Sequence, residues 1–75
     1  MAKTAVSNRI RTLRFHADEM TQQQLADAIG VSRQTVVAIE KARYSPSLEL
    51  AFKIAAVFEV PLEQVFEYQP DPPSA

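Results

Sequence analysis

The residues best suited to specific recognition lie together at positions 32–38, with the sequence SRQTVVA. An arginine can donate two hydrogen bonds to guanine O6 and N7, and a glutamine can pair with N6 and N7 of adenine. Ser32 precedes apolar residues at helical spacing, and a serine at such a position accepts hydrogen bonds from the N–H groups of the next turn. Arg33 and Gln34 are therefore expected in the first turn of a helix, where both could reach the base edges of double-stranded DNA.

The elements that must position these side chains form a helical hairpin within residues 21–40. Thr21, with a glutamine three residues later, has the pattern of a capping box. Gly30, the only glycine in the chain, stands where a tight reversal needs a positive φ. Apolar residues recur at helical spacing on both sides of it, at Leu25, Ala26, Ile29, Val36 and Ile39. The pattern predicts two helices, at 22–29 and 33–42, in a helix-turn-helix.

The stretch TQQQLADAIGVSRQTVVAIE closely resembles the helix-turn-helix of the phage-repressor family, the Cro-like or XRE-type bacterial regulators. The likeness continues through YSPSLELAFKIAAVF and VPLEQVF and covers about residues 8–67. The resemblance implies an all-α fold, a compact five-helix DNA-binding domain whose helices 2 and 3 form the helix-turn-helix. It also implies a sequence-specific transcriptional regulator, a repressor that binds a palindromic operator as a homodimer. A DNA-binding antitoxin that also binds a toxin protein is the alternative function on the same fold.

The remainder of the chain divides into three more helices and two tails. We expect a flexible N-terminal tail over residues 1–6, the domain over 7–67 and a Pro-rich tail over 68–75. A helix at 8–17 would be capped by Ser7 or Thr4, and a short helix is expected at 62–67. The helix that follows Pro46 is so apolar that we expect it to be largely enclosed at the centre of the core. It ends at Val60-Pro61, because proline cannot continue the hydrogen-bond ladder.

Three loops depart from the pattern of the family, which usually has glycine in them. Asp18 stands in the first turn, Ala42 follows the second helix of the motif, and Glu59 follows the next helix. A non-glycine residue in the left-handed conformation costs roughly 1–2 kcal/mol. We therefore expect either that strain or a different cap at Ala42 and Glu59, whereas aspartate tolerates the conformation better.

Two sets of residues are predicted to contact DNA. Base readout is assigned to Arg33, Gln34, Val37 and Ala38. Phosphate contact is assigned to Gln22, Ser32, Thr35, Lys41, Arg43 and Tyr44. Alternatives remain open for some of them: Val37 could be an isolated surface hydrophobe, Ser32 only a cap, and Tyr44 a packing residue beneath its loop. Likewise, Arg9, Arg11 and Arg14 could contact phosphate or form a solvated face.

The resemblance implies further contacts within the domain and between two copies. It pairs Arg14 with Glu40, and Gln22 with Gln34. The expected dimer interface consists of Leu62, Val65, Phe66 and Tyr68, which are more apolar than a solvated terminus requires. The alternative for this set is ordinary closure of the core over the preceding helix.

Composition limits the other classes of function. With one histidine, no cysteine, no glycine-rich phosphate loop and no convergent acid pair, we expect neither an enzyme nor a cofactor or metal site. The N-terminus lacks the apolar segment of a signal peptide, so a cytoplasmic location is expected. The net charge is −1, but residues 1–44 carry +3 and residues 45–75 carry −4. Because a polyanion responds to the local field, the basic half can bind DNA with salt-sensitive affinity.

Overall fold

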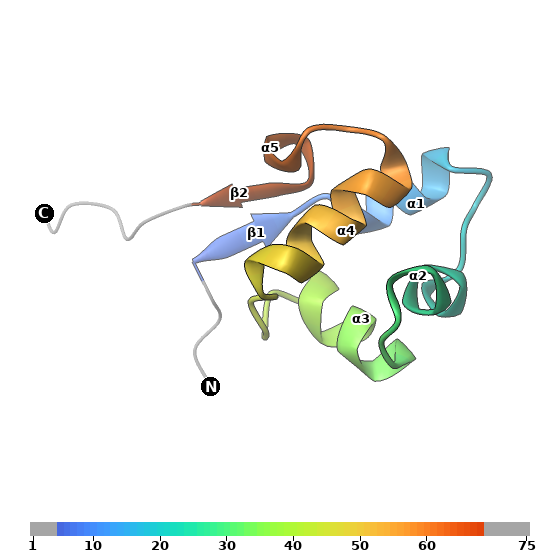
Figure 1. Cartoon of the computed structure of the whole chain (residues 1–75), viewed down its shortest axis with the longest axis horizontal. Helices are drawn as coiled ribbons and strands as arrows, with labels where there is room; N and C mark the ends of the chain where they lie inside the picture. Colours follow the sequence, from blue (N-terminus) through green and yellow to red (C-terminus); the bar gives the residue numbers. More distant parts are fainter. Residues whose placement is uncertain (1–4, 69–75) are drawn as a thin grey trace, which may run out of the picture.

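The computed structural model describes residues 5–68, which form five helices and one pair of short strands (Figure 1). The helix-turn-helix lies on one side of the long central helix, and the strand pair lies on the other (Figure 1). In chain order the elements are β1 (Val6–Asn8), α1 (Ile10–His16), α2 (Gln22–Ile29), α3 (Arg33–Glu40), α4 (Leu48–Phe58), α5 (Leu62–Val65) and β2 (Phe66–Tyr68). The predicted all-α fold with five helices is confirmed, and the small strand pair is an addition to it.

The helix-turn-helix begins and turns where its capping residues predict. The Thr21 hydroxyl accepts from the N–H of Gln24 at 3.0 Å, and the Gln24 side chain accepts from the N–H of Thr21 at 2.8 Å. Gly30 has a φ of 77°, and the Ser32 hydroxyl accepts from the N–H of Thr35 at 3.2 Å. These bonds satisfy N–H groups that have no partner inside their own helix. The second helix of the motif ends at Glu40, two residues before the predicted end.

In the loops, residues other than glycine adopt the left-handed backbone conformation. Positive φ occurs at Asp18 (60°), Ala42 (58°) and Glu59 (57°), and also at Glu19 (55°). After α3, the N–H of Ala42 donates to the Ile39 carbonyl at 2.9 Å, and the next N–H donates to the carbonyl of residue 38 at 3.0 Å. This is the hydrogen-bond pattern of a glycine-terminated helix. Of the two alternatives left open at Ala42 and Glu59, the structure therefore has the left-handed backbone and not a different cap.

The core lies between the helix-turn-helix, α4 and the first turn of α1. Its buried apolar residues are Ile10, Leu25, Ala26, Ile29, Val36, Ile39, Ile54, Ala55 and Val65. From α4, Ala51, Ile54 and Ala55 are buried, but Leu48 and Phe52 are 66% and 54% exposed. The expectation that α4 is largely enclosed is thus wrong for one of its sides, because the domain places no described element over that side.

The N-terminal part of the domain differs from the prediction. β1 pairs antiparallel with β2, with Val6 opposite Tyr68 and Asn8 opposite Phe66. Val6 and Tyr68, expected in the two tails, therefore belong to strands, and the short helix α5 stops before β2. The predicted helix 8–17 begins only at residue 10, and the side chain of Asn8 rather than that of Ser7 accepts its first N–H, at 3.2 Å. Residues 1–4, including Thr4, and 69–75 lie outside the described residues.

Candidate nucleic-acid interface

The outer face of α3 presents the residues predicted to read bases. Arg33 and Gln34, in the first turn, are exposed, while Val36 and Ile39 on the opposite face are buried in the core. The other predicted readers, Val37 and Ala38, are half-buried, and so is Thr35. The helix therefore turns its N-terminal polar residues outward, as insertion into a major groove requires.

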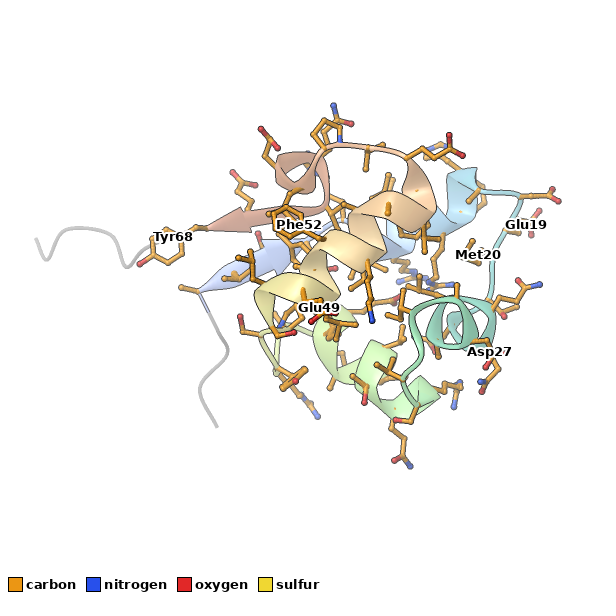
Figure 2. All side chains as sticks on the ribbon, viewed as in Figure 1. Glu19, Met20, Asp27, Glu49, Phe52 and Tyr68 are labelled. Carbon is orange, nitrogen blue, oxygen red and sulfur yellow. The ribbon has the colours of Figure 1, made fainter. Side chains whose placement is uncertain are left out.

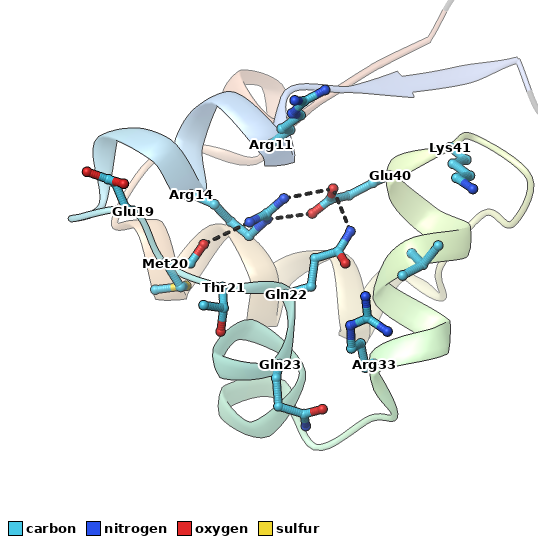
Figure 3. Close-up of a pocket in the computed structure, with 11 residues that line it drawn as sticks. Arg11, Arg14, Glu19, Met20, Thr21, Gln22, Gln23, Arg33, Glu40 and Lys41 are labelled. Carbon is cyan, nitrogen blue, oxygen red and sulfur yellow. Dashed lines mark hydrogen bonds and ion pairs between the residues drawn. The ribbon is translucent and has the colours of Figure 1, made fainter.

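A hollow of about 660 Å³ opens between α1, α2 and α3 (Figure 3). Arg33 and Val37 line it from α3, while Gln22 and Gln23 line it from the first turn of α2. Arg11 of α1 and Lys41, just after α3, also line it. Val37 is half-buried at the edge of this hollow. The hollow joins the start of α2, a place suited to a phosphate, to the face of α3 suited to base edges.

A largely buried ion pair lies at the inner side of this hollow. Arg14 Nε donates to Glu40 Oε2 at 2.7 Å, and Nη2 donates to Oε1 at 3.1 Å (Figure 3). The remaining guanidinium nitrogen, Nη1, donates to the carbonyl of Met20 at 2.8 Å. The two side chains are only 14% and 9% exposed. The predicted pairing is confirmed, and it joins α1, the loop before α2 and the end of α3.

The side chain of Gln22 is hydrogen-bonded to a member of this ion pair and not to Gln34, the partner that was expected. Its Nε2 donates to Glu40 Oε1 at 3.3 Å (Figure 3), so the expected pairing with Gln34 is wrong. The ionised carboxylate is a stronger acceptor than a neutral amide. In addition, Gln34 lines a different hollow, together with Ala38 and Tyr44. The side chain of Gln22 is consequently positioned at the start of α2 by the end of α3.

The cationic side chains of the domain fall into two groups, those with a carboxylate partner and those without one. Three cations within residues 5–68 have carboxylate partners: Arg14 as described, Arg9 with Glu67 at 3.9 Å, and Lys53 with Glu49 at 3.7 Å. The other four cations in that part of the chain, which form no ion pair there, are Arg11, Arg33, Lys41 and Arg43. All four line one or both of two hollows that share Glu40 and Lys41. The unpaired positive charge is therefore concentrated around α3.

The structure gives different surroundings to residues whose roles the sequence left open. Arg11 and Arg14 both line the hollow beside α3, but Arg14 is paired there with Glu40, whereas Arg9 is paired with Glu67 at the strand pair. Helical spacing alone does not distinguish the three arginines, because it does not show which other elements of the fold pack beside each of them. Tyr44 is 47% exposed and lies beside the outer face of α3, so it is not enclosed beneath its loop.

The predicted dimer residues separate into buried and accessible ones. Val65 is 1% exposed and belongs to the core, so its assignment to an interface is wrong. Leu62 and Phe66 are half-buried, and Tyr68 is 68% exposed. A hollow of about 310 Å³ is lined by Leu62, Phe66 and Leu48 among others. Phe52, labelled on α4 in Figure 2, follows Leu48 by four residues, and residues at this spacing share one side of a helix. We call Leu48, Phe52, Leu62, Phe66 and Tyr68 the apolar face.

Residues 5–68 contain no group of three histidine, cysteine, aspartate or glutamate side chains that could hold a metal ion. In the same residues, no helix has both the length and the apolar character needed to cross a membrane.

Comparison with known proteins gives concordant matches. A family model described as "Helix-turn-helix" matches residues 10–65. An uncharacterised HTH-type transcriptional regulator of Methanocaldococcus jannaschii is 58% identical over 52 residues, which are 69% of this chain and 79% of the relative. The HTH-type regulator YgzD of Bacillus subtilis is 44% identical over 61 residues, covering 81% of this chain and 91% of the relative.

Two further matches concern a repressor and a solved structure. The cryptic phage CTXphi transcriptional repressor RstR of Vibrio cholerae is 39% identical over 59 residues, covering 79% of this chain and 52% of the relative. The crystal structure of a candidate DNA-binding protein from Bacteroides fragilis superimposes with a TM-score of 0.72 at 26% identity, covering 83% of this chain and 98% of that one.

Proposed function

The chain belongs to the XRE-type helix-turn-helix family of DNA-binding transcriptional regulators, and from this premise we propose that it is a repressor that binds a palindromic operator as a homodimer. In this proposal α3 lies in the major groove and α2 lies across the backbone. The sign of regulation follows the likeness to the phage repressor. A regulator acts where the chromosome is, so the proposal includes a cytoplasmic location.

The observation that carries the proposal is the placement of charge. Arg11, Arg33, Lys41 and Arg43 form no ion pair within residues 5–68, and they flank α3. Glu40, whose side chain lines both hollows, is neutralised by Arg14. Arg33 is assigned to a base, so Arg11, Lys41 and Arg43 remain for phosphates. Since each neutralised phosphate contributes a slope of about −0.9 to log K against log salt, three such contacts per copy predict a slope of about −2.7 per half-site.

Sequence is read by the first two turns of α3. Arg33 pairs with a guanine, Gln34 pairs with an adenine, and Val37 contacts a thymine methyl group. Ala38 is short, so few side chains carry the readout. Phosphate contacts come from Gln22 at the start of α2, from Arg11 beside the same hollow, and from Ser32, Thr35, Lys41, Arg43 and Tyr44 around α3.

Two copies are needed to read a full operator. One domain offers a single eight-residue recognition helix, and a two-fold dimer would place two such helices one DNA turn apart, roughly 34 Å. We place the contact between copies on the apolar face, which combines the hollow lined by Leu48, Leu62 and Phe66 with the exposed Phe52 and Tyr68. Apolar residues gathered in this way on a small domain favour association.

The proposal is tested by the base preference of an Arg33→Ala variant. Base preference should disappear at one position of each half-site, with a loss of about 1–3 kcal/mol in binding free energy. Arg9→Ala is the matched control, because Arg9 is exposed and paired with Glu67 at the strand pair. Base preference that stays the same in Arg33→Ala, or that changes equally in Arg9→Ala, would refute this placement of α3.

A further inference from the structure

We propose that Asn8 is a positioning residue for DNA recognition, which fixes the C-terminal end of α3 to the strand pair. Asn8 lies outside the helix-turn-helix and was not among the predicted site residues. The inference rests on the proposed function in one respect, namely that α3 reads the bases.

The side chain of Asn8 joins three elements. Asn8 is the last residue of β1 and lies opposite Phe66 of β2. Its Nδ2 donates to the backbone carbonyl of Ile39 at 2.8 Å, in a partly buried contact that spans 31 residues of sequence. Its Oδ1 accepts from the N–H of Ile10, the first residue of α1, at 3.2 Å. One amide group therefore connects the strand pair, the start of α1 and the last turn of α3.

The point of attachment is where α3 most needs support. The Ile39 carbonyl also accepts from the N–H of Ala42, and a carbonyl oxygen can accept two such bonds. Ala42 holds a left-handed φ of 58° without glycine, so this last turn is strained. Asn8 lines a hollow together with Lys41, Ala42 and Arg43. Loss of the amide donor would thus release both the end of the helix and the loop that carries two unpaired cations.

A small movement of the C-terminal end of α3 displaces the residues at its N-terminal end. Eight residues of helix are about 12 Å long, so a tilt of about 10° moves the far end by about 2 Å. Recognition requires side chains to be held within about 0.5 Å and 10–20° of the productive geometry. Arg33 and Gln34 stand at that far end. Non-specific contact with phosphates tolerates such a shift, because long cationic side chains follow the backbone.

The experiment compares affinity for the selected operator with affinity for a random duplex of equal length. The variant is Asn8→Ser, which is uncharged and keeps an oxygen that can accept from the N–H of Ile10, but has no amide to reach Ile39. We expect operator affinity to fall about tenfold, the equivalent of one good contact. Random-duplex affinity should change less than about twofold, since the phosphate contacts remain. Ser7→Ala, next to it on the same strand, should leave the ratio unchanged.

A second variant keeps the test decisive if Asn8→Ser unfolds. Asn8→Asp retains size and the acceptor for Ile10 but directs a carboxylate oxygen at the Ile39 carbonyl. Ser7→Asp adds the same charge one residue away and corrects for repulsion of DNA. A purely structural role would lower the folded fraction, so operator and random-duplex affinities would fall by equal factors in both Asn8 variants.

The outcomes separate the two proposals. Equal falls in the two affinities, or no fall in either, would overturn the role of Asn8 while leaving the proposed function intact. Wild-type protein that shows no operator preference would overturn the proposed function, and this inference with it.

Discussion

Replacement of Arg14 by methionine should destabilise the domain more than any change of a surface charge. The substitution leaves the carboxylate of Glu40, which is 9% exposed, with only the amide of Gln22 as a partner. It also removes the bond from Arg14 to the Met20 carbonyl. Removing one member of a buried ion pair costs about 3–5 kcal/mol. A domain of 75 residues has a total stability of roughly 4–11 kcal/mol, so Tm should fall by at least about 12 °C.

The assay is urea and thermal unfolding followed by circular dichroism, arranged as a double-mutant cycle. Glu40→Leu alone should also be costly, because it leaves the guanidinium of Arg14 buried and unpaired. The double variant, Arg14→Met with Glu40→Leu, should lose much less than the sum of the two, since no buried charge remains. Lys53→Met, which breaks the exposed pair with Glu49, is the control and should cost less than about 1 kcal/mol.

Two results would refute this reasoning. A loss below about 1 kcal/mol in Arg14→Met would mean that the pair does not act as a buried one. Strictly additive losses in the cycle would mean that Arg14 and Glu40 act through separate contacts rather than through each other.

Three further predictions concern the loops and the apolar face. Ala42→Gly and Glu59→Gly should each raise the unfolding free energy by about 1 kcal/mol, because glycine relieves the left-handed strain; a loss in urea melts would contradict that account. Gly30→Ala should cost about 1–2 kcal/mol in the same assay, since φ is 77° but no atom lies within 4 Å of an added Cβ, and a much larger loss would indicate a clash. Tyr68→Glu and Phe52→Glu should shift sedimentation toward monomer, whereas an unchanged dimer would place the interface elsewhere.

Local capping chemistry made the helix-turn-helix predictable. Thr21, Gly30 and Ser32 act on backbone groups within a few residues of themselves, so their types and spacing specify the helix ends without knowledge of the rest of the fold. The Arg14–Glu40 pair is different, because its members are 26 residues apart in the sequence. It was predicted only because the chain resembles a family in which such a pair occurs.

The features that were missed depend on packing between distant segments. β1 and β2 have three residues each and pair across about 60 residues of sequence. Three residues are too few to show the alternation of apolar and polar side chains that is typical of a strand, so the sequence did not predict one. The role proposed for Asn8 depends on that strand pairing, so the sequence could not predict it either.

The sequence also could not predict which apolar side chains of α4 are exposed or which residue Gln22 bonds. The wide apolar arc of α4 does not reveal that Leu48 and Phe52 remain uncovered by the described residues. Gln22 could have bonded Gln34 or Glu40, and only the relative placement of α2 and α3 decides for the carboxylate. Such outcomes depend on distances in space, which residue types and spacing do not specify.

The measurement that tests the central claim most directly is selection of binding sites from a random DNA library, followed by affinity measurements across salt concentrations. The account predicts a palindromic motif whose half-sites lie one helical turn apart, roughly 34 Å. It also predicts that affinity falls with salt, with a slope of log K against log salt of about −2.7 per half-site. If no motif emerges and binding is weak even at low salt, the claim that α3 reads an operator is contradicted.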